Sequence, residues 1–342
     1  MRFARIQLLA LISFSIVLLA QDDTKLKEKA NRLTHEYIIV DGHVDIPYRL
    51  HNRYEDISKR TARGDFDYVR AKEGGLDAPF MSIYVPPNRE MNGAKALADT
   101  LIDMVYGFEK QWPENYAVAT SVADVRAQFK KGHLVSLPMG MENGSPIEGD
   151  LANVEYFHDR GIRYITLTHG KDNHICDSSY DTTRTWKGLS PFGKQVVAEM
   201  NRVGIMVDVS HISDDAFYQV MEISKAPVIA SHSSCRFFTP GFKRNMSNDM
   251  IRMLAKNGGV IMINYGSSFL SKEYQEKEEK VRPEITAYMR KNNLSFGDSK
   301  LDEFIAKVSK KHKFRNVDIS LVADHIDHVV KLVGIDYVGL GS

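Results

Sequence analysis

Short apolar runs alternate with amphipathic segments along almost the whole of this 342-residue chain. The runs that read as strands span residues 37–41, 79–85, 134–138, 163–168, 204–209, 227–231, 259–264 and 336–341. The segments with helical periodicity span residues 93–111, 121–131, 150–160, 191–203, 213–225, 247–257 and 318–333. Strands that alternate with helices pair in parallel, because each helix returns the chain to the same end of the sheet. About eight strands of near-continuous apolar character favour a closed (β/α)8 barrel of the TIM type over an open sheet.

The block from residue 271 to residue 316 interrupts this alternation. It is rich in Lys and Glu, with a charge run at 272–280, which predicts solvated helices rather than a further strand. It follows the seventh strand on the side where barrel active sites open, so it is placed to cover a pocket. We see no internal repeat and no low-complexity linker, and we expect one domain over residues 21–342.

The first twenty residues have the pattern of a signal peptide. A charged start, Met1–Arg5, is followed by an apolar block, Ile6–Ala20, and then by polar residues. This block is short for a membrane span, so we expect residues 1–20 to be cleaved and the protein to be exported to the periplasm or the extracellular space. An uncleaved segment that associates the protein with a membrane is the alternative.

Composition limits the partners and the cross-links of the chain. The 45 basic and 44 acidic residues nearly cancel, so neither nucleic acid nor a charged membrane surface is an expected partner. Cys176 and Cys235 are the only cysteines. Their separation in sequence leaves both a disulfide and two buried thiols open.

Side chains suited to a metal follow four of the predicted strands. His43 and Asp45 come two residues apart after the first strand, so in extended backbone both leave the same face. Glu142 lies in a glycine-containing turn after the third strand, His211 follows the fifth and His232 the sixth. The carboxyl ends of barrel strands meet at one rim, where such barrels place their catalytic groups. The sequence therefore predicts that these five side chains converge.

Imidazole and carboxylate ligands suit Zn²⁺, and their number allows two ions. His43 and Asp45 complete one site, His211 and His232 complete the other, and Glu142 bridges both through its two oxygens. Two cations about 3.5–4 Å apart hold a shared water as hydroxide near neutral pH. Hydrolysis assisted by two metal ions is therefore the chemistry predicted for this rim.

Several of these residues also have a plainer structural interpretation. His211 is placed to cap the next helix, and Glu142 has the context of an exposed loop residue. His169, after the fourth strand, has the context of a core histidine that donates to a backbone carbonyl. Asp208 lies inside the fifth strand, where it is better placed to brace a neighbour than to bind metal. Five candidate ligands in step with the strands nevertheless favour the metal site.

Longer motifs resemble those of a known family. They are Asp41-Gly42-His43-Val44-Asp45, Ile165-Thr166-Leu167-Thr168-His169, Gly188-Leu189-Ser190-Pro191-Phe192-Gly193, Ser231-His232-Ser233-Ser234, Lys243-Arg244-Asn245 and Val322-Ala323-Asp324-His325-Ile326-Asp327-His328. In this order they resemble the motifs of the membrane (renal) dipeptidase family of zinc peptidases. The resemblance covers the chain from Tyr37 to Ser342.

This resemblance implies a barrel of the metal-dependent hydrolase type that cleaves dipeptides and tolerates a D-residue on the C-terminal side. Matched by position, the ligands of two zinc ions are His43, Asp45, Glu142, His211 and His232, with Glu142 bridging. His169 matches the histidine that contacts and polarises the scissile carbonyl, and Arg244 matches the arginine that binds the substrate carboxylate. An imidazole can stabilise an oxyanion and a guanidinium pairs a carboxylate bidentately, so the chemistry agrees. The family also implies a homodimer and, in its animal members, a glycolipid anchor.

Two departures from the family pattern affect these expectations. Phe269 stands in the strand-seven loop where the family has a tyrosine, although Tyr265 lies close by. The sequence stops at Ser342, where the family continues with an Asp-Phe-Asp-Gly segment whose first Asp moves the proton from the bridging water to the leaving amine. We therefore expect a partial sequence of an active enzyme, with the last β/α unit incomplete and an edge strand exposed.

Two rival functions remain open from the sequence. One is another metal-dependent amidohydrolase that acts on a cyclic amide or a lactone. Many of those bridge their metals with a modified lysine, and no lysine follows a strand here whereas Glu142 does. The other is a catalytically impaired metal-binding protein, if the last acid is truly absent; sequencing beyond Ser342 would decide that.

Overall fold

The computed structural model describes residues 24–294, 298–313 and 315–342. The expected signal peptide, residues 1–20, lies outside this part of the chain. Among the described helices we find none that combines the length and the apolar character needed to cross a membrane.

Eight parallel strands form a closed barrel, which confirms the predicted (β/α)8 fold. In sequence order they are β1 (Val40–Val44), β2 (Ala78–Tyr84), β5 (Met139–Glu142), β6 (Ile162–Thr166), β7 (Met206–Asp208), β8 (Ile229–Ser233), β9 (Val260–Ile263) and β10 (Val338–Leu340). The last strand, β10, pairs with β9 on one side and with β1 on the other, where Asp41 lies opposite Leu340. The prediction of an exposed edge strand is therefore wrong for the barrel.

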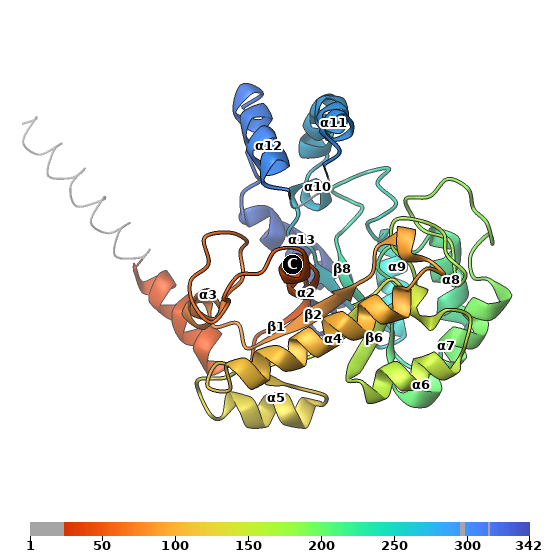
Figure 1. Cartoon of the computed structure of the whole chain (residues 1–342), viewed down its shortest axis with the longest axis horizontal. Coiled ribbons are helices and arrows are strands. Elements are labelled where there is room, and N and C mark those ends of the chain that lie inside the picture. Colours follow the sequence, from red (N-terminus) through yellow and green to blue (C-terminus); the bar gives the residue numbers. More distant parts are fainter. Residues whose placement is uncertain (1–23, 295–297, 314) are drawn as a thin grey trace, which may run out of the picture.

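Helices flank or overlie the strands, and most of them lie where the sequence periodicity predicts (Figure 1). They are α2 (Ile46–Asn52), α3 (Tyr68–Gly74), α4 (Ala94–Gln111), α5 (Val122–Phe129), α6 (Ala152–Asp159), α7 (Pro191–Val203), α8 (Asp214–Ile223), α9 (Asn248–Lys256), α10 (Ser267–Leu270), α11 (Lys272–Asn292), α12 (Ser299–Lys311) and α13 (Ser320–Val333). Serine side chains cap several of them; Ser213, for example, accepts a hydrogen bond from the backbone N–H of Ala216 at the start of α8.

The prediction for the first strand is displaced by three residues. Asp41-Gly42 continues β1 instead of ending it, so His43 lies within the strand. Gly42 is required there because a Cβ atom would lie 2.1 Å from Met262 Sδ and 2.6 Å from the Ser231 carbonyl oxygen. The Asp-Gly pair, which resembles a turn in sequence, is in fact a point of close packing inside the barrel.

The prediction of residues 134–138 as the third barrel strand is wrong. That apolar run forms β4 (Val135–Leu137), which pairs with β3 (Tyr116–Val118) in a separate two-stranded sheet. The barrel strand is β5, which follows directly. A Cβ atom on Gly140 in β5 would lie 2.0 Å from the ring of Tyr164, so the strand needs a glycine that weakens its pattern in the sequence.

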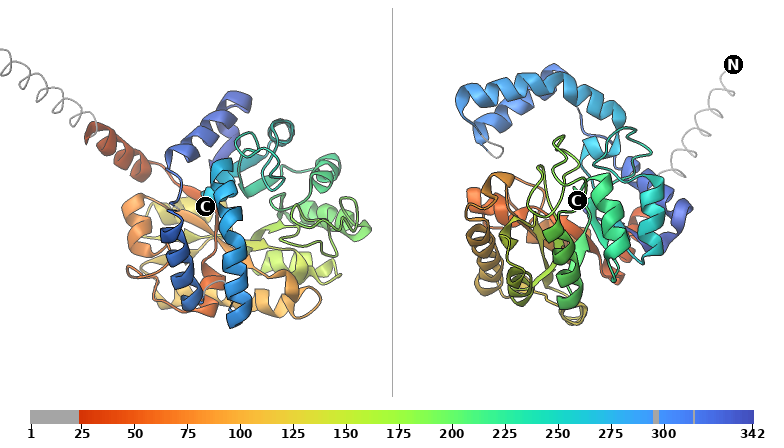
Figure 2. Two further views of the ribbon diagram at one scale, coloured as in Figure 1. Left: turned by 90° about the horizontal axis from the view of Figure 1, so that it is seen from above. Right: turned by 90° about the vertical axis from the view of Figure 1, so that its right-hand side faces the viewer.

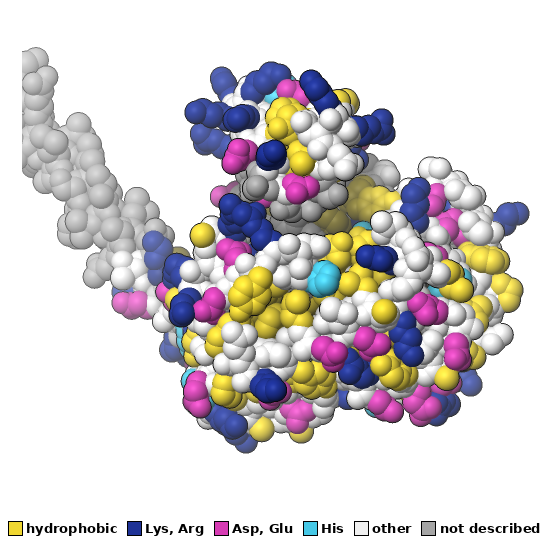
Figure 3. Space-filling model, in the orientation of Figure 1, with side chains coloured by type: hydrophobic (Ala, Val, Ile, Leu, Met, Phe, Trp, Pro, Cys, Tyr) yellow, Lys and Arg dark blue, Asp and Glu magenta, His cyan; other side chains and the backbone are white. Residues whose placement is uncertain are grey.

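The charged block after β9 forms the helical pair α11 and α12, as predicted. Tyr288 of α11 stacks on Phe304 of α12 with ring centroids 3.8 Å apart, and Lys311 pairs with Glu284 across the two helices. The pair stands out from the rest of the molecule (Figure 2), and many Lys and Arg side chains lie on its surface (Figure 3).

Candidate metal centre

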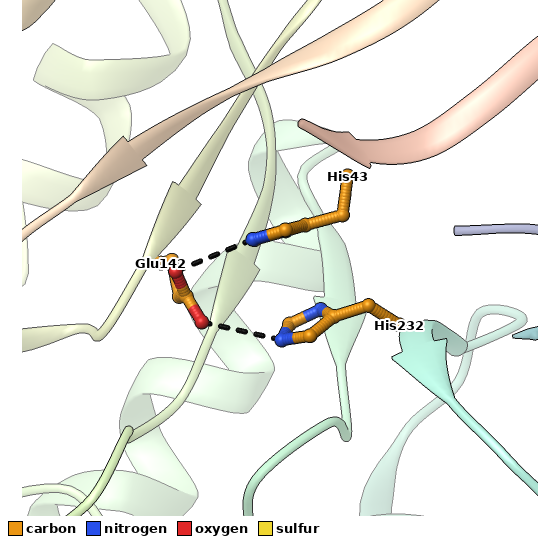
Figure 4. A group of neighbouring side chains, drawn as sticks. All are labelled: His43, Glu142 and His232. Carbon is orange, nitrogen blue, oxygen red and sulfur yellow. Dashed lines mark ion pairs between the residues drawn. The ribbon is translucent and has the colours of Figure 1, made fainter. Parts of the chain in front are cut away.

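Three strand ends bring His43, Glu142 and His232 together (Figure 4). Glu142 is the last residue of β5 and is 3 % exposed. His43 Nε2 lies 3.3 Å from Glu142 Oε2, and His232 Nε2 lies 3.2 Å from Glu142 Oε1. The rings of His43 and His232 stack with centroids 3.8 Å apart. One buried carboxylate thus has an imidazole at each of its oxygens.

Two further histidines reach the same carboxylate from loops. His211, after β7, places Nε2 3.0 Å from Glu142 Oε1, and His169, after β6, places Nε2 3.6 Å from that oxygen. His211 has a φ of 70°, in the left-handed region that costs an ordinary residue about 1–3 kcal/mol. Its backbone is fixed by a 2.7 Å hydrogen bond from the N–H of Ser179 to its carbonyl oxygen. The fold therefore holds this imidazole in place against local strain.

Asp45 lies at the mouth of the site. Its Oδ1 is 3.5 Å from His43 Nε2, and its side chain is 65 % exposed, unlike the buried histidines. The oxygens of Glu142 thus face different groups: Oε2 faces His43, with Asp45 beside it, and Oε1 faces His211 and His232. The sharing of these groups between two ions stays a prediction, since the donor atoms of His43 and His232 also lie together around Glu142.

The donor set fits a divalent metal. The donor atoms of His43, Glu142 and His232 all lie within 4.8 Å of one another, as do those of Glu142, His169 and His211. The His211 and His232 Nε2 atoms lie 2.9 Å apart. Buried imidazoles around one carboxylate are nitrogen and oxygen ligands of the kind that Zn²⁺ takes.

The electrostatics of the site favour an ionised Glu142 among neutral imidazoles. Burial opposes the charge of Glu142, but His43 and His169 hold its pKa well below the usual range. Burial, reinforced by Arg244, lowers the pKa of His211 far below its usual value, and burial with His43 lowers the pKa of His232 to about 4. A neutral imidazole is the form that binds a metal.

His43 differs from these two histidines. Burial disfavours its charged form, but Tyr164, Glu142 and Asp45 together raise its pKa well above the usual value. The proton on Nε2 is stabilised by the carboxylate that it faces, and a bound cation would take its place.

Arg244 is a buried cation beside this cluster. Its Nη1 donates to Ser233 Oγ at 2.7 Å and its Nη2 to the His232 carbonyl oxygen at 2.8 Å, while Nε is buried with no partner among the described residues. No carboxylate within the described ranges forms an ion pair with it. Phe269 lies under the guanidinium, 5.2 Å from ring centroid to Cζ. Such a cation is prepared to bind an anion.

Sequence reasoning missed the groups that support the ligands. Ser82 donates to Glu142 Oε2 at 3.3 Å, and Tyr164 lies 3.0 Å from His43 Nδ1, both from inside the barrel. Of the missed groups, only Ser231 had a sequence context that suggested a role, because it directly precedes the candidate ligand His232. Asp208 accepts hydrogen bonds from Ser231, as its expected bracing role implies.

Other polar candidates lie outside the cluster. His174 pairs with Glu90 at 2.5 Å from Nδ1 to Oε1.

Cys176 and Cys235 are both buried free thiols, so the structure contains no disulfide between them. Burial raises the pKa of the Cys235 thiol to about 12, which makes it unreactive near neutral pH.

Imidazole and carboxylate groups gathered at the carboxyl ends of the strands of a closed (β/α)8 barrel are typical of metal-dependent hydrolases. The family model of membrane dipeptidase, peptidase family M19, matches residues 27–342. The chain belongs to this family.

Relatives and solved structures agree with this assignment. The chain is 31% identical to dipeptidase 3 of Mus musculus over 94% of its length, and 32% identical to an uncharacterised dipeptidase of Schizosaccharomyces pombe over 72%. These alignments span 57% and 63% of the two relatives, so the chain covers about three fifths of their length.

Two crystal structures share the fold at 25% identity. One is the probable dipeptidase PvdM of Pseudomonas aeruginosa, with a TM-score of 0.76 over 93% of this chain and 86% of that one. The other is a metallopeptidase of Rhodobacter sphaeroides bound to a phosphinate mimic of the dipeptide L-Ala-D-Ala, with a TM-score of 0.70 over 89% and 85%.

Proposed function

We propose that this protein is a dinuclear zinc dipeptidase. The observation that carries the proposal is the buried carboxylate of Glu142, whose two oxygens face two separate sets of imidazoles. One ion would take His43, Asp45 and Glu142, and the other would take Glu142, His211 and His232. Membership of the membrane dipeptidase family supports the same choice.

The two ions would supply the nucleophile. Zinc ions held by His43, Asp45, Glu142, His211 and His232 would lower the pKa of a water molecule between them, which is the chemistry that such ions supply to hydrolysis. The barrel contributes a rigid frame, since His43, Glu142 and His232 lie on strands and His211 follows three residues after the end of β7.

His169 is placed to act on the carbonyl oxygen of the substrate. Burial, opposed by Glu142, lowers its pKa, so the imidazole is neutral at pH 7 and has one N–H to donate. It is partly exposed, whereas His211 and His232 are buried, so a substrate can reach it. A donor aimed at the developing oxyanion stabilises the tetrahedral intermediate.

Arg244 would bind the free carboxylate at the C-terminal end of the dipeptide. Its guanidinium is buried and has no acidic partner among the described residues, so a carboxylate would satisfy its charge. If the C-terminal carboxylate is held close to the ions, few residues fit between it and the peptide bond that is cleaved. This favours dipeptides over longer peptides. The L-Ala-D-Ala mimic on the Rhodobacter sphaeroides relative supports tolerance of a D-residue at this end.

The cellular context completes the proposal. We infer a single catalytic domain over residues 21–342, preceded by a cleaved leader over residues 1–20, and export to the periplasm or the extracellular space with membrane association as the alternative. A homodimer is the expected assembly.

A substrate comparison tests the function. Zinc-loaded protein should hydrolyse L-Ala-L-Ala and L-Ala-D-Ala, should be inactive on Ala-Ala-Ala, and should leave cyclic amides and lactones intact. Turnover of a lactone or a cyclic amide without dipeptide hydrolysis would establish the rival amidohydrolase. Tight binding of two zinc ions without turnover of any of these compounds would establish the metal-binding rival.

A further inference from the structure

Tyr164 contacts both the Gly42 carbonyl group and the ring of His43. Its hydroxyl lies 3.0 Å from the Gly42 carbonyl oxygen and 3.0 Å from His43 Nδ1. A carbonyl oxygen only accepts, so the single hydroxyl proton of Tyr164 is donated to Gly42. The Tyr164 oxygen must then accept from His43, and Nδ1 carries that proton. Nε2 is left as the nitrogen that faces Glu142 Oε2.

A similar series of contacts joins Asp208 and Ser231 to the ring of His232. Ser231 Oγ lies 2.6 Å from Asp208 Oδ2 and 2.7 Å from His232 Nδ1. The buried carboxylate of Asp208 is an acceptor, so the Ser231 hydroxyl proton is directed to it. Ser231 Oγ then accepts from His232 Nδ1, and His232 Nε2 is left to face Glu142 Oε1.

Asp208 is itself fixed by several hydrogen bonds. Its Oδ1 accepts from the backbone N–H groups of Ser210 at 3.0 Å and Ser231 at 2.9 Å, and its Oδ2 also accepts from the Thr166 hydroxyl. These bonds leave the carboxylate one orientation, and the hydroxyl of Ser231 is oriented with it. The strands β6, β7 and β8 thereby act together on one imidazole.

The other two histidines lack such a partner. The Nδ1 atoms of His211 and His169 are buried and have no hydrogen-bond partner among the described residues. The two oriented imidazoles face different oxygens of Glu142, so each would serve a different ion.

We infer that Tyr164 and the Ser231–Asp208 pair are positioning residues of the metal centre, which keep His43 and His232 protonated at Nδ1 and so present Nε2 to the two ions. This inference rests on the metal site of the proposed function and extends it to residues that contact neither metal nor substrate. Ordered partners of this kind typically change metal affinity by about 10–100-fold when they are removed.

The test uses Tyr164→Phe and Ser231→Ala, which remove the accepting oxygen without adding bulk. Zinc affinity is measured by competition with a chromophoric chelator. We expect each variant to bind one of its two ions about 10–100-fold more weakly while the other ion is retained. The matched controls are Tyr116→Phe, whose hydroxyl donates to the Ile57 carbonyl at 2.6 Å in a fully buried position, and Ser136→Ala in β4. Both controls should keep both zinc affinities.

Nitrogen-15 NMR of the histidine rings gives a readout that needs no metal. In the metal-free wild type, Nδ1 of His43 and of His232 should each carry a proton, and the matching variant should lose this state. An unprotonated Nδ1 in either ring of the wild type, or unchanged zinc affinities in folded Tyr164→Phe and Ser231→Ala, would overturn the inference. Absence of zinc binding by the wild type would instead count against the proposed function. The NMR measurement needs no metal, so it would still test the inference.

Discussion

Glu142→Gln should abolish both zinc sites and, with them, dipeptide hydrolysis. The carboxylate is the one group that faces both sets of imidazoles, through Oε2 to His43 and through Oε1 to His211 and His232. A carboxamide keeps the shape but has one acceptor oxygen and no charge, so it cannot join two cations. Zinc per chain, measured by mass spectrometry of the dialysed protein, should fall from two to below one.

Asp77→Asn is the matched control for this change. Asp77 is also a buried carboxylate, and it lies directly before β2, at the end of the barrel opposite Glu142. It accepts the N–H of Ile39 at 3.0 Å, and burial raises its pKa. This variant should keep two zinc ions and full turnover. Two zinc ions retained by Glu142→Gln would show that the carboxylate is not the bridge.

His232→Ala should remove one of the two ions and reduce activity below detection. His232 Nε2 faces Glu142 Oε1 beside His211, so its loss leaves that ion with His211 and one carboxylate oxygen. A zinc site commonly needs three protein ligands to hold its ion. The dialysed variant should contain one zinc per chain, and full turnover at that content would refute a mechanism that needs two ions.

His325→Ala separates loss of a ligand from loss of a buried histidine. His325 is fully buried in α13, where Nδ1 accepts from the Cys235 N–H at 3.1 Å and Nε2 donates to the Leu270 carbonyl oxygen at 3.2 Å. Its replacement should lower stability by about 1–3 kcal/mol, because these groups lose their partner. The zinc content should remain at two per chain.

The barrel could be predicted because apolar strands and amphipathic helices alternate at nearly constant spacing. The two errors of strand placement both involve glycines that pack against another strand: Gly42 in β1 and Gly140 in β5. A glycine in a sequence suggests a turn or a break, and only the packing shows that a side chain of a facing strand occupies the space. The strand β3 was not predicted, because its three residues are too few to show a strand pattern in the sequence.

The gathering of His43, Glu142, His211 and His232 follows from one rule, because the carboxyl ends of parallel strands share a rim. The supporting groups could not be found in that way. Tyr164 lies in the middle of β6, and its hydroxyl reaches His43 across the barrel interior, a contact that depends on the tilt and register of strands far apart in sequence. The position of Asp208 within its strand indicated a bracing role, but the sequence did not show that Ser231 and Thr166 are its hydrogen-bond partners.

Crystals of the zinc-loaded protein, measured on either side of the zinc absorption edge, test the central claim most directly. The proposed function predicts two anomalous peaks about 3.5–4 Å apart, one on each oxygen of Glu142. His43 and Asp45 should contact one peak, and His211 and His232 the other. A single peak, or peaks away from Glu142, would contradict the two-ion site.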